Sequence, residues 1–198
     1  RAPAGRGLLS GARAGARLVG VGERGVIVVS DDEGGQWKQV PAPTSVTLTA
    51  VAFADARHGV AVGHGGMVLA TSDGGQTWAV RLDGLQVARL ALEQTSSAEQ
   101  TREAERLVAD GPDKPFLSVL MWDARRWLVA GAYGLVFETR DAGATWSSLM
   151  GRVPNEGLLH WYVLARQGNT LLMAGEQGLL ARSTDGGATF SSVTSPYR

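Results

Sequence analysis

The sequence contains no cysteine, so disulfides, thiol nucleophiles and thiolate metal sites are all excluded. Neither charge is in excess, because 19 basic residues balance 19 acidic ones, and this leaves no electrostatic argument for binding nucleic acid or an anionic membrane. Charged residues interrupt every apolar stretch before the roughly 18 residues that a membrane helix needs. We therefore expect a globular chain that binds no nucleic acid and does not itself span a membrane.

Glycine is the residue present in excess, with 27 among 198 positions, about twice its average usage. No three-residue period accompanies it, which excludes a collagen-like chain. The length allows one or two domains with enough core to fold without metals or disulfides.

The glycines belong to a repeat that occurs four times. Each copy reads Ser or Thr, any residue, Asp, any residue, Gly, any residue, usually Thr, then Trp or Phe. Two glycines precede each Asp by ten and seven residues: Gly22 and Gly25, Gly63 and Gly66, Gly131 and Gly134, Gly175 and Gly178. The positions that define the four motifs are Asp32, Gly34, Trp37; Asp73, Gly75, Trp78; Asp141, Gly143, Trp146; and Asp185, Gly187, Phe190.

The spacing predicts an all-β fold. The four Asp residues are 41, 68 and 44 residues apart, and a period of 40 to 45 with several short apolar runs is typical of a four-stranded propeller blade. We expect blades over residues 8–40, 48–81, 116–149 and 160–193, each ending in a strand that starts near the Thr of the motif. Apolar runs such as Val26–Val29 fit sheets covered on both faces by neighbouring blades.

The long gap holds one insertion, residues 84–115. Within it, Ser96-x-x-Glu99 is a capping box that predicts a helix over residues 100–109, followed by a Gly111-Pro112 stop. The apolar face of this helix is thin (Ala104, Leu107 and Val108), so we expect it to lie against the sheets rather than form a second domain.

The four motifs resemble Asp-boxes, the bacterial-neuraminidase repeat of sialidases and other propellers. Together with the upstream glycines, they are most similar to the photosystem II stability/assembly factor-like family, whose blades carry G-x-x-G followed by T-x-D-G-G-x-T-W. The similarity covers the chain except for the insertion. It departs from the pattern at Gln36, which replaces the Thr, and at Phe190, which replaces the Trp.

A structural role is the favoured interpretation of the Asp-boxes. Each Asp can accept hydrogen bonds from its own turn, each Gly can adopt positive φ, and each aromatic ring can pack between sheets. The alternative, in which the four carboxylates bind a metal or sugar, is less favoured because one copy per blade is what a fold-stabilising turn requires.

Catalytic and metal sites find little support. Glycosidases need two carboxyls or a Tyr–acid pair, and sialidases also use an arginine cluster; none of the arginines lies in such a motif. His58 and His64 are expected at opposite ends of a short strand, and His160 is expected to have no partner, so no metal and no cofactor is predicted.

Other noticeable residues also have ordinary interpretations. The Asp-Ala-Arg segments 55–57 and 123–125 are interpreted as turns with their own hydrogen bonds. Trp122, Trp127 and Trp161 are interpreted as packing between blades rather than as stacking platforms for a ligand.

Blade topology indicates where a partner would bind. Asp-boxes and Asp-Ala-Arg turns fall at one end of the blades, whereas the G-x-x-G turns, the connections between blades and the insertion fall at the other. Side chains at that second end differ between blades, which favours recognition there. The candidate partner-binding residues are Glu23, Arg24, His64, Tyr133, Glu176 and Gln177.

The resemblance implies a non-catalytic, extracytoplasmic accessory protein, periplasmic in bacteria, that helps to assemble a membrane protein complex. That complex need not be photosystem II; in non-photosynthetic bacteria it could be an exporter. The alternative is a sialidase-like glycoside hydrolase or a carbohydrate-binding propeller. Propellers of the family often close with seven blades, so we expect either part of a longer propeller or a processed chain with an incomplete ring.

Overall fold

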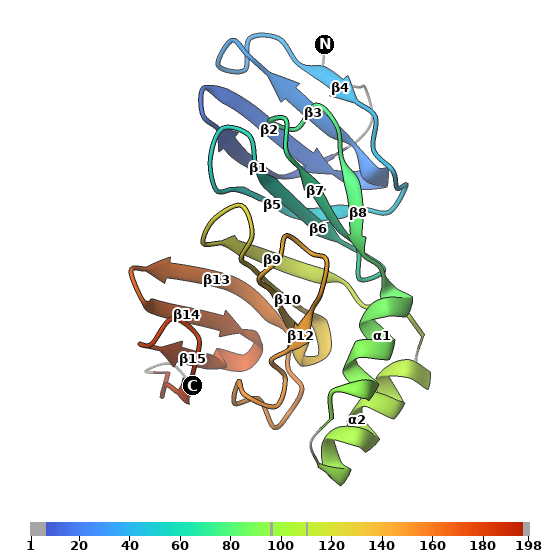
Figure 1. The fold of residues 1–198 in the computed structure, drawn as a ribbon, viewed down its shortest axis with the longest axis vertical. Helices are drawn as coiled ribbons and strands as arrows, with labels where there is room; N and C mark the ends of the chain where they lie inside the picture. The colour runs from blue at the N-terminus through green and yellow to red at the C-terminus, as the bar shows by residue number, and fades with distance from the viewer. Residues whose placement is uncertain (1–6, 96, 110, 196–198) are drawn as a thin grey trace.

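The computed structural model describes residues 7–95, 97–109 and 111–195. They form four antiparallel sheets of four strands each, which follow one another from the blue end of the chain to the red end (Figure 1). The strands are β1 Leu8–Ala14, β2 Arg17–Gly22, β3 Ile27–Ser30, β4 Lys38–Val40; β5 Leu48–Phe53, β6 Gly59–Gly63, β7 Val68–Thr71, β8 Ala79–Leu82; β9 Phe116–Met121, β10 Trp127–Gly131, β11 Val136–Thr139, β12 Ser147–Ser148; and β13 Trp161–Gln167, β14 Thr170–Gly175, β15 Leu180–Ser183, β16 Ser191–Ser192.

Each sheet is a simple up-and-down meander in which consecutive strands pair, and we call the four sheets blades one to four. The first strands of successive blades (β1, β5, β9 and β13) contact one another. The blades therefore radiate from their first strands, which is the architecture of a β-propeller. The all-β propeller fold predicted from the repeat is confirmed.

The fourth strands are shorter than the predicted ones. They begin at Lys38, Ala79, Ser147 and Ser191, directly after the motif aromatic, whereas the repeat predicts a start near the Thr. The Thr and the aromatic residue belong to the turn itself, because the Asp carboxylate fixes the turn through the Thr amide. The predicted strand starts are therefore two residues too early in all four blades.

The insertion contains two helices, not the one that the sequence predicts. Helix α1 spans Gly84–Glu93 and helix α2 spans Ala98–Ala109, and they pack against each other (Figure 1). Asp83 caps α1 with a capping box, accepting from the Gln86 amide at 2.9 Å while Gln86 Oε1 accepts from the Asp83 amide at 3.1 Å. The predicted capping residue Ser96 lies outside the described residues.

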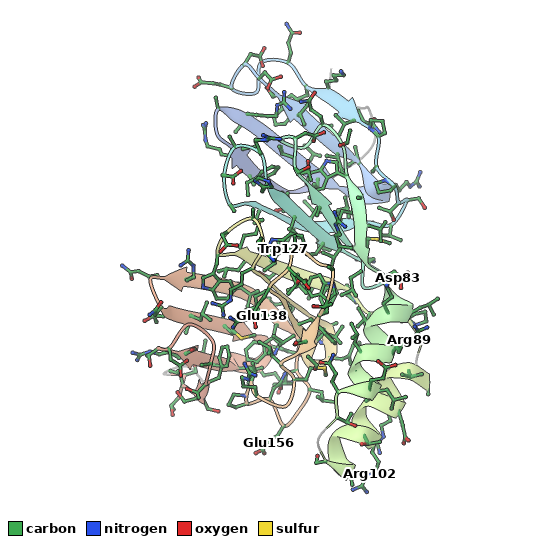
Figure 2. All side chains as sticks on the ribbon, viewed as in Figure 1. Asp83, Arg89, Arg102, Trp127, Glu138 and Glu156 are labelled. Carbon is green, nitrogen blue, oxygen red and sulfur yellow. The ribbon has the colours of Figure 1, made fainter. Side chains whose placement is uncertain are left out.

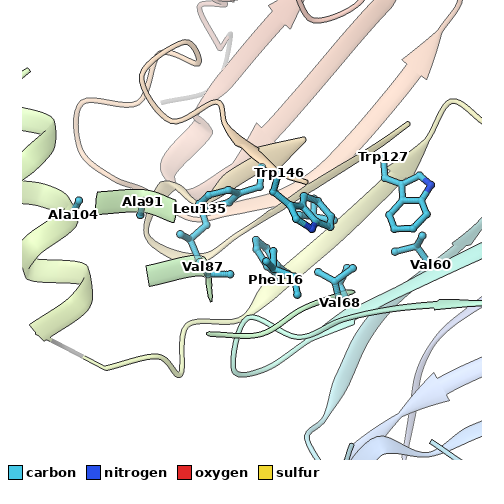
Figure 3. Packing of buried hydrophobic residues seen from close by; sticks show 13 residues of the cluster. Val60, Val68, Val87, Ala91, Ala104, Phe116, Trp127, Leu135 and Trp146 are labelled. Atoms are coloured by element: carbon cyan, nitrogen blue, oxygen red, sulfur yellow. The ribbon is translucent and has the colours of Figure 1, made fainter. Parts of the chain in front are cut away.

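Helix α1, rather than α2, makes most of the contact with the sheets. Val87 and Ala91 of α1 and Ala104 of α2 are buried in the cluster that fills the space between blades two and three (Figure 3). Val108, expected to face the sheets, is 41% exposed. The two-helix insertion therefore extends the core between two blades through its inner face.

Three hydrophobic clusters fill the spaces between successive blades. The motif aromatics of blades two and three pack backward on the preceding blade: Trp78 joins the cluster with Val19 and Val21 of blade one, and Trp146 joins Val60 and Val62 of blade two. Trp146 Nε1 also donates to the Arg81 carbonyl of blade two at 3.2 Å. Because Trp78 and Trp146 are only 8% and 7% exposed, each contributes a few kcal/mol of stability.

Candidate partner-binding face

The G-x-x-G segments form tight turns between the second and third strands of each blade. In three of them the third residue is not glycine but adopts left-handed backbone angles: Arg24 at φ 53°, Tyr133 at φ 53° and Gln177 at φ 54°. In blade two the same position is Gly65, at φ 63°. An L-residue in this region costs about 1–2 kcal/mol, so three blades hold a large polar or aromatic side chain at a strained position.

The first glycine of each turn is required by a close approach rather than by positive φ. A Cβ built on Gly63 would lie 2.2 Å from the Thr47 carbonyl oxygen, and those on Gly22, Gly131 and Gly175 meet the equivalent carbonyls at 2.0, 2.1 and 2.3 Å. The next amide then donates to that carbonyl, as His64 N does to Thr47 O at 2.9 Å. This contact fastens each turn to the chain segment that precedes the first strand of its blade.

Two of the six candidate residues are engaged within their own blade. The Glu23 carboxylate accepts from the Gly7 amide at 3.1 Å, and the Glu176 carboxylate accepts from the His160 amide at 3.2 Å. In both blades the glutamate amide donates back to the carbonyl of the same residue. These glutamates therefore hold the start of the first strand, which leaves Arg24, His64, Tyr133 and Gln177 as exposed side chains on this face.

Aromatic and cationic groups gather around Tyr133, whose side chain is 44% exposed. Its ring lies edge-on to the His160 ring with centroids 4.9 Å apart, and Lys114 Nζ lies 5.2 Å from its centroid. The Tyr133 amide donates to His160 Nδ1 at 2.9 Å, which places the remaining ring proton on Nε2. Tyr162 continues the cluster, with its ring centroid 6.4 Å from that of His160.

His160 has a partner, contrary to the expectation from the sequence. It lies 27 residues from Tyr133 in the chain but beside it in space, because His160 precedes the first strand of blade four and Tyr133 turns at the end of blade three. Only the fold brings the two together. The His160 ring orients the strained Tyr133 turn by accepting from its amide.

Tyr162 belongs to this cluster, although nothing in the sequence pattern singles it out. Each innermost strand carries a β-bulge after its first residue, so that Leu9, Thr49, Leu117 and Tyr162 each lack a directly opposed partner. A bulge re-aims its side chain, and Tyr162 is 48% exposed beside His160. A one-residue slip in pairing leaves no signal in a single sequence.

A cavity of about 220 Å³ lies next to this face, between the helical insertion and blade three. Ala91, Ala104, Met150 and Leu158 supply apolar walls, and Gly134 of the Tyr133 turn also lines it. Glu156, labelled near the lower end of Figure 2, is exposed at its rim. The cavity is large enough for one side chain of a bound protein.

The Asp-boxes lie at the opposite end of the blades. The third residue after the first Ser or Thr of the motif donates its backbone amide to a carbonyl in the hairpin between the first two strands. Gly74 N donates to Arg57 O at 2.9 Å, and Ala142 N donates to Arg125 O at 2.9 Å. The box turns and the Asp-Ala-Arg turns are thus joined at one end. The G-x-x-G turns, which bond to the segments preceding the first strands, occupy the other.

The Asp-box carboxylates accept hydrogen bonds from their own turns. In blade three, Asp141 accepts from the Thr145 hydroxyl at 2.6 Å, from the Thr145 amide at 2.8 Å and from the Thr139 hydroxyl at 2.9 Å. These bonds lower the pKa of Asp141 to about 2, the Thr145 hydroxyl being the largest cause. In the first box, Gln36 supplies an amide but no hydroxyl, so Asp32 has one bond fewer to its turn.

The Asp-Ala-Arg turns are held by their own carboxylates. Asp55 accepts from the Arg57 and His58 amides at 2.7 and 2.8 Å, and the His58 ring lies within 3.0 Å. Bonds from the His58 amide first, then from the Arg57 amide, lower the pKa of Asp55 to about 2. Asp123 makes the same two amide bonds in blade three, and its pKa is likewise lowered.

Tryptophans singled out in the sequence lie within or beside the sheets. Trp127, labelled in Figure 2, is 2% exposed and packs between blades two and three, while Trp161 is fully buried between blades three and four. Trp122 is half-buried, with the Arg126 guanidinium 3.9 Å from its ring centroid. Arg126 also pairs with the buried carboxylate of Glu138 at 2.7 Å. Its guanidinium therefore contacts both a carboxylate inside the sheet and the half-buried ring of Trp122.

Metal-binding groups do not converge in the part of the chain that the structure describes: no three His, Asp or Glu side chains there could hold one ion. Among the same residues, no helix is both long and apolar enough to cross a membrane.

Part of the chain matches a known protein family. The profile of the family described as photosynthesis system II assembly factor YCF48 matches residues 29–101. The chain is 40% identical over 82 residues to the chloroplastic photosystem II stability/assembly factor HCF136 of Cyanidioschyzon merolae, a match covering 38% of this chain and 19% of that protein. The matched segment therefore spans about a fifth of that relative's length.

Solved structures share the fold over nearly the whole chain. A structure described as YCF48 bound to D1 peptide has a TM-score of 0.51 at 15% identity, covering 98% of this chain and 70% of the other. The GH74 xyloglucanase of Xanthomonas campestris has a TM-score of 0.61 at 16% identity, covering 92% of this chain and 29% of the enzyme. At these identities the likeness extends to the fold alone. The chain is thus a β-propeller with Asp-box turns, and its matched segment is similar to the photosystem II stability/assembly factors.

Proposed function

We propose that this propeller is a non-catalytic assembly factor that binds a segment of a protein partner on the G-x-x-G face. The partner belongs to a membrane protein complex, and the binding takes place outside the cytoplasm. Sequence similarity to photosystem II assembly factors supports the role. The complex need not be photosystem II, and an exporter complex would fit the same role in a non-photosynthetic bacterium.

The strained Tyr133 turn is the observation that carries the proposal. Holding a tyrosine at φ 53° is unfavourable for folding, yet the ring remains 44% exposed and is supported by His160 and Lys114. Strain of this kind is concentrated at binding and catalytic sites. Tyrosine also supplies a large contact area with little rotamer entropy to lose on binding.

A peptide segment is the partner chemistry that fits this surface. Tyr133, His160 and Tyr162 present aromatic edges, and the cavity beside Gly134 can take one apolar side chain. Lys114, which pairs with Asp113 at 3.0 Å, supports the Tyr133 ring. The YCF48 structure described with a D1 peptide supports a peptide as the ligand class for a propeller of this kind.

The Asp-box carboxylates and Glu138 favour binding over glycoside hydrolysis. The four box aspartates accept hydrogen bonds from their own turns, and the buried Glu138 pairs with Arg126 and Arg140. Glycoside hydrolysis instead needs two carboxyls that flank a sugar ring and are free to exchange protons.

Site-specific photocrosslinking tests the binding face. A benzophenone amino acid placed at Tyr133 should crosslink to one membrane-complex subunit in cells, and adding His160→Ala should reduce the yield at least tenfold. The same probe at the exposed Arg57, on the Asp-box end, serves as the matched control. Equal crosslinking from both ends would contradict the proposal.

A turnover assay tests the non-catalytic assignment. Incubating the protein with a fluorogenic sialoside and with xyloglucan should give no product above a heat-denatured control. Product formation that a single carboxylate substitution abolishes would replace the binding role with an enzymatic one.

A further inference from the structure

The Tyr133 turn is held by a side chain that can gain a proton. The Tyr133 amide donates to Nδ1 of His160 at 2.9 Å, so this nitrogen must carry a lone pair. Histidine is the side chain whose charge ordinarily changes between about pH 5 and pH 8. In the imidazolium both ring nitrogens carry protons, and neither can accept a hydrogen bond. A proton on His160 therefore removes the acceptor and leaves two N–H donors facing each other.

Blade two makes the matching contact with a group that does not titrate. Its turn has Gly65 at the position of Tyr133, and the Gly65 amide donates to the Asp113 carbonyl at 3.3 Å. In both blades the acceptor belongs to the segment that precedes the first strand of the next blade. Blade three thus differs from blade two in using an imidazole where blade two uses a backbone carbonyl.

The loss of this bond has a larger effect on Tyr133 than it would have on a glycine. Tyr133 is held at φ 53°, which is unfavourable for a residue with a side chain, whereas Gly65 adopts φ 63° without steric cost. A strained backbone conformation persists only when its surroundings hold it. Removing the hydrogen bond at the Tyr133 amide therefore shifts the turn toward relaxed backbone angles.

Other titratable groups lie around the His160 ring, on its own strand and on the elements packed against it. They are Tyr162 of β13, Tyr133 of the turn, Glu176 of the following turn, and Lys114 and Asp113 before β9. The two phenols are neutral in this pH range. The Glu176 carboxylate accepts from the His160 backbone amide at 3.2 Å, and Lys114 pairs with Asp113 at 3.0 Å. These charges are thus bonded elsewhere, and Nδ1 of His160 is the acceptor that holds the Tyr133 amide.

We propose that His160 is a proton-sensitive lock on the Tyr133 turn. The neutral ring holds the turn in its strained form, and mild acid, which protonates the ring, releases the turn together with the bound partner segment. The release of the segment rests on the proposed function, whereas the lock itself does not. Binding is therefore strongest while His160 is neutral and weakens as the pH falls and the ring gains its proton.

Amide hydrogen exchange, followed by NMR on the full chain without a partner, tests the lock. We compare the protection of the Tyr133 amide, which is its exchange rate relative to the intrinsic rate at the same pH. From pH 7.5 to pH 5 this protection should fall about tenfold, because one hydrogen bond is lost. The Gly65 amide is the internal control, since its carbonyl acceptor gains no proton in this range, and its protection should not change.

His160→Asn separates the proton from the shape of the contact. The side-chain oxygen of asparagine can accept from the Tyr133 amide at either pH, so this variant should keep its protection at pH 5. His64→Asn, at an exposed histidine on the same face, is the matched control and should show the same loss as the wild type. Circular dichroism at both pH values checks that each variant is folded.

Photocrosslinking tests whether the lock controls binding. With a benzophenone amino acid at the exposed Gln177 of the same face, crosslinking to a membrane-complex subunit in isolated membranes should be about tenfold weaker at pH 5 than at pH 7.5. Adding His160→Asn should make the yield equal at the two pH values.

The two measurements fail in different ways. Equal protection of the Tyr133 amide at both pH values, or a loss that persists in His160→Asn, would overturn the lock. Crosslinking that does not change with pH while the protection falls would overturn the control of binding. No crosslinking at either pH would refute the proposed function, and the exchange data would still decide the lock.

Discussion

At the scale of single residues, the negative charge of the Asp-box carboxylate stabilises the folded protein. Asp141 has a pKa of about 2 in the folded protein, below its ordinary value of 3.8, because the Thr145 hydroxyl and amide bond to the charged form. A lowered folded pKa adds stability that is complete above the unfolded pKa and disappears as pH falls through the folded one. This advantage is therefore present at neutral pH and is lost between about pH 4 and pH 2.

Asp141→Asn should lower the urea midpoint at pH 7, and the difference from wild type should shrink as the pH falls from 4 to 2. The amide keeps the shape of the side chain but not its charge, so the pH dependence isolates the carboxylate. Glu156→Gln, at an exposed acid, is the control and should leave the midpoint unchanged at every pH. A constant difference down to pH 2 would show that shape, not charge, stabilises the turn.

Gly63→Ala tests the close approach between the turn and the preceding segment. The new Cβ would lie 2.2 Å from the Thr47 carbonyl oxygen, so the backbone must shift, and we expect a loss of about 1–3 kcal/mol in the free energy of unfolding. Gly11→Ala is the matched control in a strand, where the Cβ has ordinary contacts. Equal stability of both variants in chemical denaturation would argue that flexibility alone selects glycine at position 63.

At the scale of secondary-structure elements, helix α1 protects the outer strand of blade three. The Gln94 side-chain amide, at the C-terminal end of α1, donates to the Trp146 carbonyl at 3.0 Å and accepts from the Ser148 amide at 2.6 Å. These two bonds are of the kind that a neighbouring strand would make with the backbone of the edge strand β12. The helix thereby covers an edge that could otherwise pair with another chain.

Gln94→Leu should speed hydrogen exchange at the Ser148 amide and lower the free energy of unfolding by about 1 kcal/mol, because both bonds are lost. Glu93→Leu, at the preceding exposed position, adds the same side chain without removing either bond. Unchanged exchange at Ser148 in the Gln94 variant would mean that water replaces the side chain fully.

The comparison of sequence with structure shows which signals a single sequence carries at this scale. The repeat spacing predicts the blades because glycine and Asp occupy fixed positions in every copy. Helix α1 is not among the predicted elements, although Asp83-x-x-Gln86 has the same capping pattern as the Ser96 segment. The Tyr133–His160 contact and the bulge at Tyr162 could not be predicted, because both depend on how two blades meet in space.

At the scale of the whole molecule, the insertion behaves as an addition to a complete repeat. Its ends lie together, since a Cβ on Gly84 would touch the Pro112 carbonyl, and Gly65 and Gly66 donate to the Asp113 and Lys114 carbonyls at 3.3 and 2.9 Å. The four sheets can therefore be connected without it.

Replacing residues 84–112 with a Gly-Gly linker should leave the far-ultraviolet spectrum of the sheets in place while lowering the free energy of unfolding by about 3 kcal/mol. The loss reflects the burial of Val87, Ala91 and Ala104 against blades two and three. Arg89→Ala, on the exposed side of α1, is the matched control and should have little effect. An unfolded deletion variant would show that the helices are essential to the core.

The backward packing of Trp78 and Trp146 has a consequence for synthesis on the ribosome. Trp78 reaches a surface made by blade one, and Trp146 reaches one made by blade two, so each of these blades docks on a neighbour that has already emerged. Domains fold from the N-terminus as the chain is made. The nascent protein can thus add one blade at a time, and each new blade covers the exposed face of the blade before it.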